Sequence, residues 1–189
     1  RNGFSPDKAA HLVTDLRAMV ADVHQAGVLI VDLNEMNLLV ARDFSEVYGI
    51  DADSYQTSQY PATVIMPSVM DPKVRGNDFT EMSDWFSFGI VAFQMLVGIH
   101  PFKGKHTGFT GPDKLKARME AGVSVFNKDV RVPKAVLPFD VIPDAYRDWF
   151  KQVFEKGARI APPTGLTGTI VFVPVIRTIG GTRNLDITL

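Results

Sequence analysis

The chain has 189 residues, of which 46% are hydrophobic, and its 20 Lys and Arg residues nearly balance its 21 Asp and Glu residues. This length and composition are typical of one globular domain with an appendage. The near-neutral charge, without a basic stripe, argues against a nucleic-acid partner. No apolar run reaches the roughly 20 residues that a membrane span requires.

The absence of Cys excludes disulfides and thiolate metal sites and favours a cytoplasmic location. The four His residues lack the paired spacing of a zinc site. The sequence starts at Arg1 without an initiator Met, so we expect a fragment or a processed product.

The first predicted element is a helix that follows Ser5-Pro6-Asp7 and ends at Gly27. Leu12, Leu16 and Val20 recur in it at helical spacing. The next apolar runs, Val28 to Val31 and Leu38 to Val40, are short and rich in β-branched residues, which predicts two buried strand pieces joined by a polar loop.

Residues 46–50 predict a third strand piece, and residues 51–77 predict a long irregular segment. Residues 84–98 are strongly apolar and predict a buried central helix that ends at Gly98. A polar helix is expected over 112–121 and an amphipathic helix over 144–156, whose apolar face comprises Tyr146, Trp149, Phe150 and Phe154.

The last segment, residues 164–189, predicts a linker followed by a β-hairpin around Gly180-Gly181. We therefore expect a main unit over residues 1–163 and an extension over 164–189.

Three polar residues, Asp32, Asn37 and Asp51, stand among the apolar runs. They would converge if the two strand pieces end at the same edge. Mg²⁺ prefers oxygen ligands and is usually held by one or two carboxylates together with substrate phosphates. The alternative is that Asp32 and Asn37 bond only the backbone of their own loop.

The order of the motifs distinguishes these alternatives. Asp32 and Asn37 have the spacing D-x-x-x-x-N, and the later motifs are Asp51-Ala52-Asp53, Met66-Pro67-Ser68, Asp84-Trp85-Phe86-Ser87-Phe88-Gly89 and "GIHPFKG". Together they resemble the H-R-D-L-x-x-x-N, D-F-G, A-P-E and D-x-W-S-x-G motifs of the C-terminal lobe of a protein kinase. The resemblance covers residues 8 to about 163.

This resemblance implies a mainly α fold, α+β overall, in which short strand pieces bear the catalytic and metal loops. It also implies ATP and Mg²⁺ as cofactors and a protein as substrate. Asp32 would orient or accept the proton of the substrate hydroxyl, while Asn37 and Asp51 would hold magnesium.

The same resemblance assigns roles to four further positions. Leu39 and Ile50 would line the adenine site. Asp84 would brace the catalytic loop through its backbone amides, and it could also cap the buried helix. Gly89 would give structural support within that helix.

Several positions depart from the family pattern. Ile30 and Val31 replace the His and Arg before the catalytic Asp, so activation by phosphorylation of the following loop is not expected. Asn34, at a catalytic position that is often Lys, would leave the transferring phosphate without a cation and lower turnover. Asp53 replaces the Gly of D-F-G and is expected in solvent.

Ser68 replaces the Glu of A-P-E, so the usual ion pair of that Glu with a later Arg, here Arg159, is not expected to form.

Three functions fit these residues: a Ser/Thr protein kinase, a pseudokinase scaffold, and a small-molecule phosphotransferase of the aminoglycoside-kinase type. The D-x-W-S-x-G helix argues against the third. Retention of Asp32, Asn37 and Asp51 favours the first. A kinase also needs a Gly-rich loop and a strand Lys from an N-terminal lobe, which we expect as a partner because nothing before Ser5 supplies them. We expect this fragment alone to be inactive.

Overall fold

The structure is a computed structural model in which residues 4–62 and 64–165 are described. Within these ranges the fold is mainly helical, as predicted. It comprises the helices α1 (Pro6–Gln25), α2 (Glu81–Val97), α3 (Lys114–Ala121) and α4 (Asp144–Phe154), and the strands β1 (Leu38–Val40) and β2 (Val47–Gly49). Three short 3₁₀ turns lie over Glu35–Asn37, Ala52–Ser54 and Phe139–Val141.

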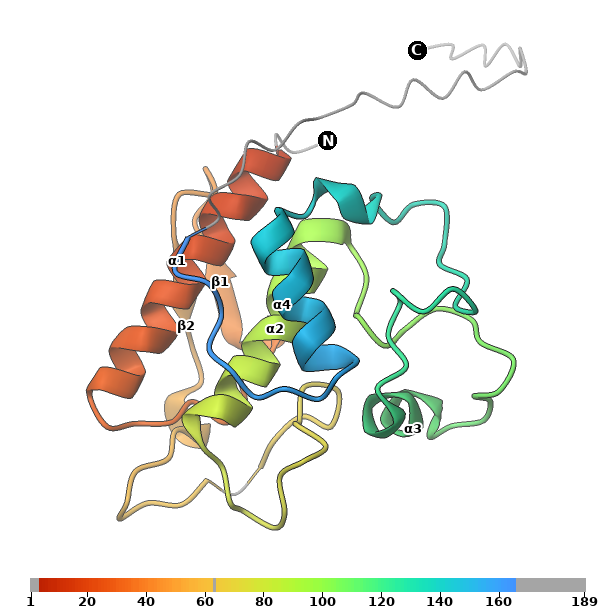
Figure 1. Ribbon diagram of the computed structural model, residues 1–189. Coiled ribbons are helices and arrows are strands. Elements are labelled where there is room, and N and C mark those ends of the chain that lie inside the picture. The colour runs from red at the N-terminus through yellow and green to blue at the C-terminus, as the bar shows by residue number, and fades with distance from the viewer. Residues whose placement is uncertain (1–3, 63, 166–189) are drawn as a thin grey trace, which may run out of the picture.

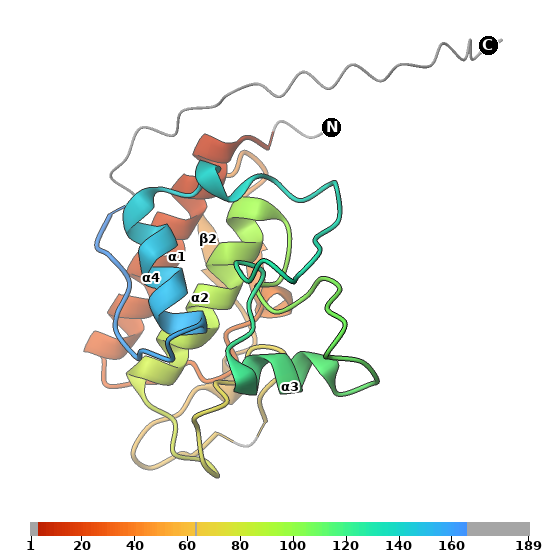
Figure 2. The same cartoon turned by 45° about the vertical axis from the view of Figure 1, so that its right-hand side comes forward.

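Helix α2 forms the centre of the molecule, with α1 and α4 packed against it (Figure 1). Most of its residues are buried, including Phe88, Ile90 and Phe93. The apolar face predicted for α4 is confirmed, because Tyr146, Trp149, Phe150 and Phe154 are all buried. Figure 2 shows that α3 lies apart from this trio, at the end of the molecule opposite the N-terminus of α1.

The predicted ends of the helices are largely confirmed. The Ser5 hydroxyl accepts a hydrogen bond from the Lys8 amide at the start of α1, and Gly98 ends α2 with a φ of 80°. Helix α2 begins one turn before the predicted Asp84 because Thr80 and Ser83 form a reciprocal capping box. The cap is thus Thr80, and the capping role considered for Asp84 is wrong.

The strand predictions need two corrections. Residues 28–31 form no strand, and only Leu29 makes an isolated antiparallel bridge, to Gln56. Strands β1 and β2 pair antiparallel, with Leu39 opposite Tyr48, but they are not buried on both faces. Because side chains alternate along a strand, one face of the hairpin packs on the core while Leu39 and Tyr48 point outward, about half exposed.

Residues 51–77 are irregular apart from one 3₁₀ turn, as predicted, with residue 63 not described. The expected C-terminal hairpin lies outside the described residues. No helix over the described ranges has both the length and the apolar character that crossing a membrane requires.

Candidate functional site

The loop that carries Asp32 is fixed by Asp84, which lies in the first turns of α2. One carboxylate oxygen of Asp84 accepts the Ile30 amide at 2.7 Å and the other accepts the Val31 amide at 2.9 Å. His24, near the end of α1, contacts the same carboxylate at 2.9 Å. Asp84 is fully buried, so two helices and the loop meet at one buried acid.

The loop backbone is held in an unusual conformation directly before Asp32. Val31 has a φ of 64°, in the left-handed region, which a β-branched residue rarely enters. Such a conformation costs on the order of 1–3 kcal/mol and persists only where the surroundings impose it. The hydrogen bond from Val31 to buried Asp84 provides that restraint.

Asp32, Asn37 and Asp51 line one small hollow together with Ile50, so the residues with metal-ligand chemistry do converge. The Asn37 amide group donates to the carbonyl of Asp32 at 3.1 Å and to its carboxylate at 3.2 Å. The Met66 amide donates to the other carboxylate oxygen of Asp32 at 2.7 Å. Both carboxylate oxygens of Asp32 are therefore oriented by named donors.

The donor set fits a magnesium ion that is completed by phosphates. Because Asn37 donates through nitrogen, its side-chain oxygen remains directed elsewhere, and neither this oxygen nor the Asp51 carboxylate accepts a hydrogen bond from the described residues. The described ranges hold no cluster of three or more His, Cys, Asp or Glu suited to a metal. The amide oxygen of Asn37 and the carboxylate of Asp51 would need further oxygen ligands from a substrate, which is the usual arrangement for Mg²⁺.

Asn34, unlike Asp32 and Asn37, does not line the hollow. Its side chain is 1% exposed, its nitrogen donates to the Asp32 carbonyl and its oxygen accepts the Met36 amide. Both polar ends of Asn34 are thus used inside the loop. The structure places Asn34 in the frame of the loop, whereas Asp53 is exposed, as expected.

Leu39 and Ile50 lie at the hairpin, near the hollow. Leu39 is 54% exposed and Ile50 is 40% exposed, and only Ile50 lines the hollow itself. With Tyr48 they form an open apolar surface, which we call the shelf.

Gly89 lies away from the hollow, where α2 crosses α4. A β-carbon at this position would lie 3.0 Å from Cη2 of Trp149 and 3.3 Å from Cζ of Phe154. Its role is therefore to let the two helices approach.

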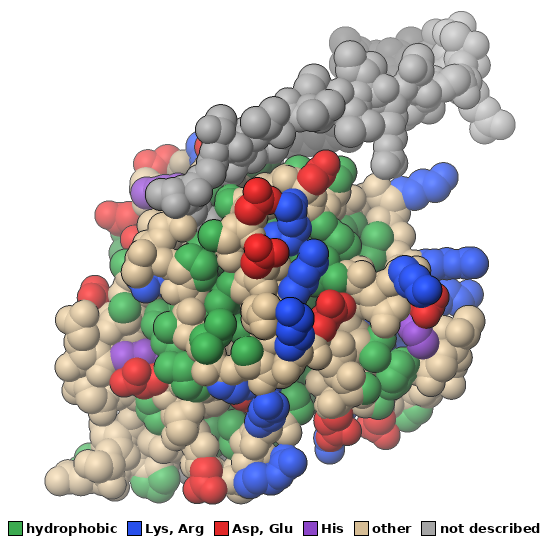
Figure 3. Space-filling view, in the orientation of Figure 1, with side chains coloured by type: hydrophobic (Ala, Val, Ile, Leu, Met, Phe, Trp, Pro, Cys, Tyr) green, Lys and Arg blue, Asp and Glu red, His purple; other side chains and the backbone are tan. Residues whose placement is uncertain are grey.

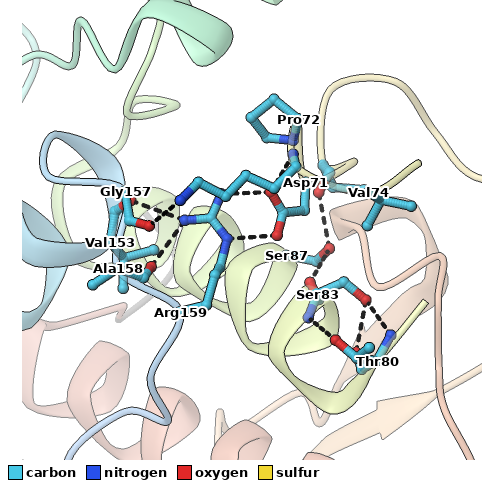
Figure 4. A network of polar contacts seen from close by, with 12 residues as sticks. Asp71, Pro72, Val74, Thr80, Ser83, Ser87, Val153, Gly157, Ala158 and Arg159 are labelled. Carbon is cyan, nitrogen blue, oxygen red and sulfur yellow. Dashed lines mark hydrogen bonds and ion pairs between the residues drawn. The ribbon is translucent and has the colours of Figure 1, made fainter. Parts of the chain in front are cut away.

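The ion pair of Arg159 forms after all, with a different acid. Asp71, three residues after Ser68, binds Arg159 through both carboxylate oxygens (Figure 4). Arg159 also donates to the carbonyls of Val153 and Ala158 and stacks on Phe86 with 4.6 Å to the ring centroid. Ser68 makes no ion pair with Arg159, as expected, but Arg159 is still paired, because Asp71 in the irregular segment supplies the carboxylate.

Ser68 itself contacts His100 of the "GIHPFKG" motif. Nε2 of His100 lies 2.8 Å from the Ser68 carbonyl, and Nδ1 accepts the Phe102 amide at 3.1 Å. Nδ1 must be unprotonated to accept, so Nε2 carries the proton and donates. Burial is the main cause that lowers the pKa of His100 to about 4, which keeps the ring neutral.

Sequence reasoning missed His24, Asp71 and the role of His100. A lone His on a helix carries no local signal of its partner. Asp71 was obscured because Met66-Pro67-Ser68 already occupied the A-P-E place.

Curated proteins with sequences similar to this chain include serine/threonine protein kinases. The chain is 28% identical over 136 residues to the probable serine/threonine-protein kinase PknB of Lactococcus lactis, covering 69% of this chain and 21% of that protein. It is 25% identical over 171 residues to the RAC family serine/threonine-protein kinase homolog of Dictyostelium discoideum, covering 85% and 34%.

A third relative is ribosomal protein S6 kinase alpha-3 of Mus musculus, 25% identical over 121 residues, with 61% of this chain and 16% of that protein covered. No protein-family model matches the chain. The chain is thus related to serine/threonine protein kinases, and it spans about a fifth of the length of the first of these relatives.

Proposed function

We propose that this chain forms the C-terminal lobe of a kinase that transfers phosphate from ATP, with Mg²⁺, to Ser or Thr of a protein. The observation that carries the proposal is the convergence of Asp32, Asn37 and Asp51 in one hollow, in a chain related to such kinases.

In this function Asp32 orients the substrate hydroxyl and accepts its proton, because a general base needs a carboxylate at hydrogen-bond distance from the attacking oxygen. The donors Met66 and Asn37 fix the direction of that carboxylate. Asn37 and Asp51 would hold magnesium, which would supply positive charge to the phosphate during transfer. Asn34 positions the loop, because both polar ends of its side chain bond the loop backbone.

The shelf of Leu39, Tyr48 and Ile50 is the floor of the adenine site in this proposal. An open floor buries too little of a nucleotide, since ligand sites usually enclose 70–90% of a small molecule. Exposed apolar surface of this kind marks a missing partner surface. The proposal therefore requires an N-terminal lobe to cover the shelf and to supply the phosphate-binding loop and Lys.

The second candidate is a pseudokinase scaffold, in which the same lobe binds partners without transfer. It is favoured by Asn34, an uncharged residue that is buried in the loop, so that this position offers no cation to a transferred phosphate. A cytoplasmic location remains a prediction for both functions.

The decisive experiment is Asp32→Asn in a chain that includes the N-terminal lobe, assayed with radiolabelled ATP. We expect transfer to be abolished with the circular dichroism spectrum retained, while the control Asp22→Asn, at an exposed position of α1, keeps its activity. An unchanged rate in Asp32→Asn excludes this residue as the base. Nucleotide binding without transfer in the unmutated protein establishes the scaffold.

The 189-residue chain alone is expected to bind Mg-ATP too weakly to raise its melting temperature. A rise of several degrees in a thermal-shift titration at sub-millimolar ATP would show that this lobe suffices.

A further inference from the structure

The backbone amide that orients Asp32 lies in a stretch without helix or strand, so its position depends on contacts from other parts of the chain. Met66 donates this amide to the Asp32 carboxylate at 2.7 Å. Two residues later, the Ser68 carbonyl accepts a hydrogen bond from Nε2 of His100 at 2.8 Å. The stretch is therefore tied to the candidate catalytic residue at one end and to a buried ring at the other.

Residues 66–69 form one hydrogen-bonded turn, which we call the Met66 turn. The Val69 amide donates to the Met66 carbonyl at 3.0 Å, which is the bond that closes a β-turn. Pro67 is the second residue of this turn, where a ring that holds φ at about −65° favours the conformation. The carbonyl of the third residue, Ser68, takes no part in the closing bond and is free to accept from His100. A turn that is closed and stiffened in this way should move as one body.

The ring of His100 is itself fixed, so that it can hold the turn. Nδ1 accepts the Phe102 amide at 3.1 Å, which leaves the single N–H of the neutral ring at Nε2, directed at the Ser68 carbonyl. The side chain is 3% exposed, and a hydrogen bond away from water is electrostatically stronger. His100 therefore presents one donor in one direction.

The surroundings of His100 keep the ring neutral and its loop in place. Burial is the main cause that lowers the pKa of this ring, and Lys103 and Arg118 act in the same direction. Glu35 and the Ser68 contact oppose this shift of the pKa. Arg118 of α3 is only 2% exposed and donates to the Lys103 carbonyl at 3.1 Å, whereas many Lys and Arg side chains project from the face in Figure 3. The loop of His100 is thus anchored to α3 independently of the Met66 turn.

We propose that His100 is a positioning residue for phosphoryl transfer. Through the Ser68 carbonyl it sets the Met66 turn, and the first amide of this turn directs the Asp32 carboxylate toward the substrate hydroxyl. This rests on the proposed function. Without His100 the turn would shift, and a displacement of about 1 Å at a reacting group can cost roughly a hundredfold in rate.

The first test uses the 189-residue chain without ATP, so that its outcome does not depend on catalysis. His100→Asn retains an oxygen near the place of Nδ1, which can accept the Phe102 amide, but its side chain is too short to reach Ser68. His100→Gln has the opposite properties, because its amide nitrogen reaches the place of Nε2. Hydrogen exchange of single amides, followed by NMR, compares the two variants.

The expected pattern is crossed. Exchange of the Met66 amide should accelerate about tenfold in His100→Asn, as one lost hydrogen bond allows, and less than about twofold in His100→Gln. Exchange of the Phe102 amide should accelerate more in His100→Gln than in His100→Asn. A general loss of stability raises both rates together and does not produce this crossing.

The second test measures phosphoryl transfer in a chain that includes the N-terminal lobe. His100→Asn is expected to lower kcat about tenfold and to change the KM for ATP less than about twofold, because the direction of Asp32 matters during transfer and not during nucleotide binding. His100→Gln should retain most of the unmutated kcat. The matched control is His106→Asn, since Nδ1 of His106 likewise accepts the amide two residues later, that of Gly108, at 2.9 Å. This control should keep its rate.

A further variant, Pro67→Gly, loosens the turn and leaves its anchor unchanged. Pro67 is exposed, so the substitution does not disturb the core, but it removes the ring that restricts the backbone. We expect a lower kcat, with the Nε2–H tautomer of His100 retained in the ¹⁵N NMR spectrum of the imidazole.

Unchanged exchange of the Met66 amide in His100→Asn overturns the proposal. Equal losses of kcat in His100→Asn and His100→Gln also overturn it, because they indicate a general packing role. Absence of transfer by the unmutated longer protein overturns the proposed function, and the exchange pattern then decides separately whether His100 holds the turn.

Discussion

Asp71 and Arg159 lie 88 residues apart in sequence and form a bidentate ion pair whose side chains are only 4% and 16% exposed. The pair joins the irregular segment of residues 51–77 to the chain that follows α4. Since it is largely removed from water, each charge depends on the other.

Asp71→Ala is expected to destabilise the protein by roughly 3–5 kcal/mol, because Arg159 would be left buried without a partner charge. Urea denaturation measures the loss. Arg159→Lys is also expected to destabilise the protein, since an ammonium group cannot match the two-point contact that the guanidinium makes with Asp71. The control Glu120→Ala, from an exposed pair with Lys116, should cost less than about 1 kcal/mol. Equal losses in the two Ala variants would contradict this account.

Asp84→Asn is expected to release the catalytic loop. An amide group can present only one oxygen, so one of the Ile30 and Val31 amides would face a donor and lose its partner. The free energy of unfolding should fall by roughly 1–3 kcal/mol. Hydrogen exchange of the Ile30 and Val31 amides should accelerate strongly, while amides in the middle of α4 change only with global stability. Unchanged protection of both amides would refute the bracing role.

Gly89→Ala is expected to destabilise by roughly 1–3 kcal/mol, although Ala favours a helix, because the new methyl group meets the rings of Trp149 and Phe154. The cost should shrink when Trp149→Phe removes the closest atom, which a double-mutant cycle monitored by thermal unfolding would detect. A neutral or stabilising Gly89→Ala would show that the helices can separate freely.

His100 predicts a loss of stability in mild acid. The pKa of this ring falls from 6.5 to about 4 in the folded chain, mainly through burial, with Lys103 and Arg118 acting in the same direction and Glu35 and the Ser68 contact opposing. Between these values the unfolded chain binds a proton that the folded chain does not. Stability therefore falls as the pH drops from about 6.5 to 4, by up to roughly 3 kcal/mol from this residue.

The non-titrating variant His100→Gln separates this effect from the carboxylates. Urea unfolding at pH 7 and pH 5 should show a smaller difference for the variant than for the unmutated chain. Parallel losses in both proteins would rule out His100 as the cause.

Asp51→Ala is expected to weaken magnesium-dependent nucleotide binding in the longer protein much more than Asp53→Ala does. Both residues are exposed, but of the two only Asp51 lines the hollow with Asp32 and Asn37. Calorimetry with Mg-ATP compares the two. Equal losses would mean that Asp53 is also a ligand.

The helices were predictable because their apolar residues repeat at helical spacing and their ends carry local signals such as Ser5 and Gly98. The grouping of Asp32, Asn37 and Asp51 followed from motif order. The ion pair of Asp71 was not predicted, because its partner Arg159 is distant in sequence and no local pattern connects the two residues. The exposure of Leu39 was also missed, since a short apolar run does not reveal which face of a strand has a covering neighbour.

One turn of α2 holds two separate segments of the chain. Asp84 accepts hydrogen bonds from the amides of Ile30 and Val31, and the Ser87 hydroxyl donates to the carbonyl of Val69 at 2.8 Å. Local opening of this turn would free the loop of Asp32 and the segment before Asp71 at the same moment. The two segments should therefore behave as one cooperative unit, opening together in native-state hydrogen exchange at a common free energy. Damage to either would be transmitted to the other through this turn, in addition to the direct hydrogen bond from the Met66 amide to the Asp32 carboxylate.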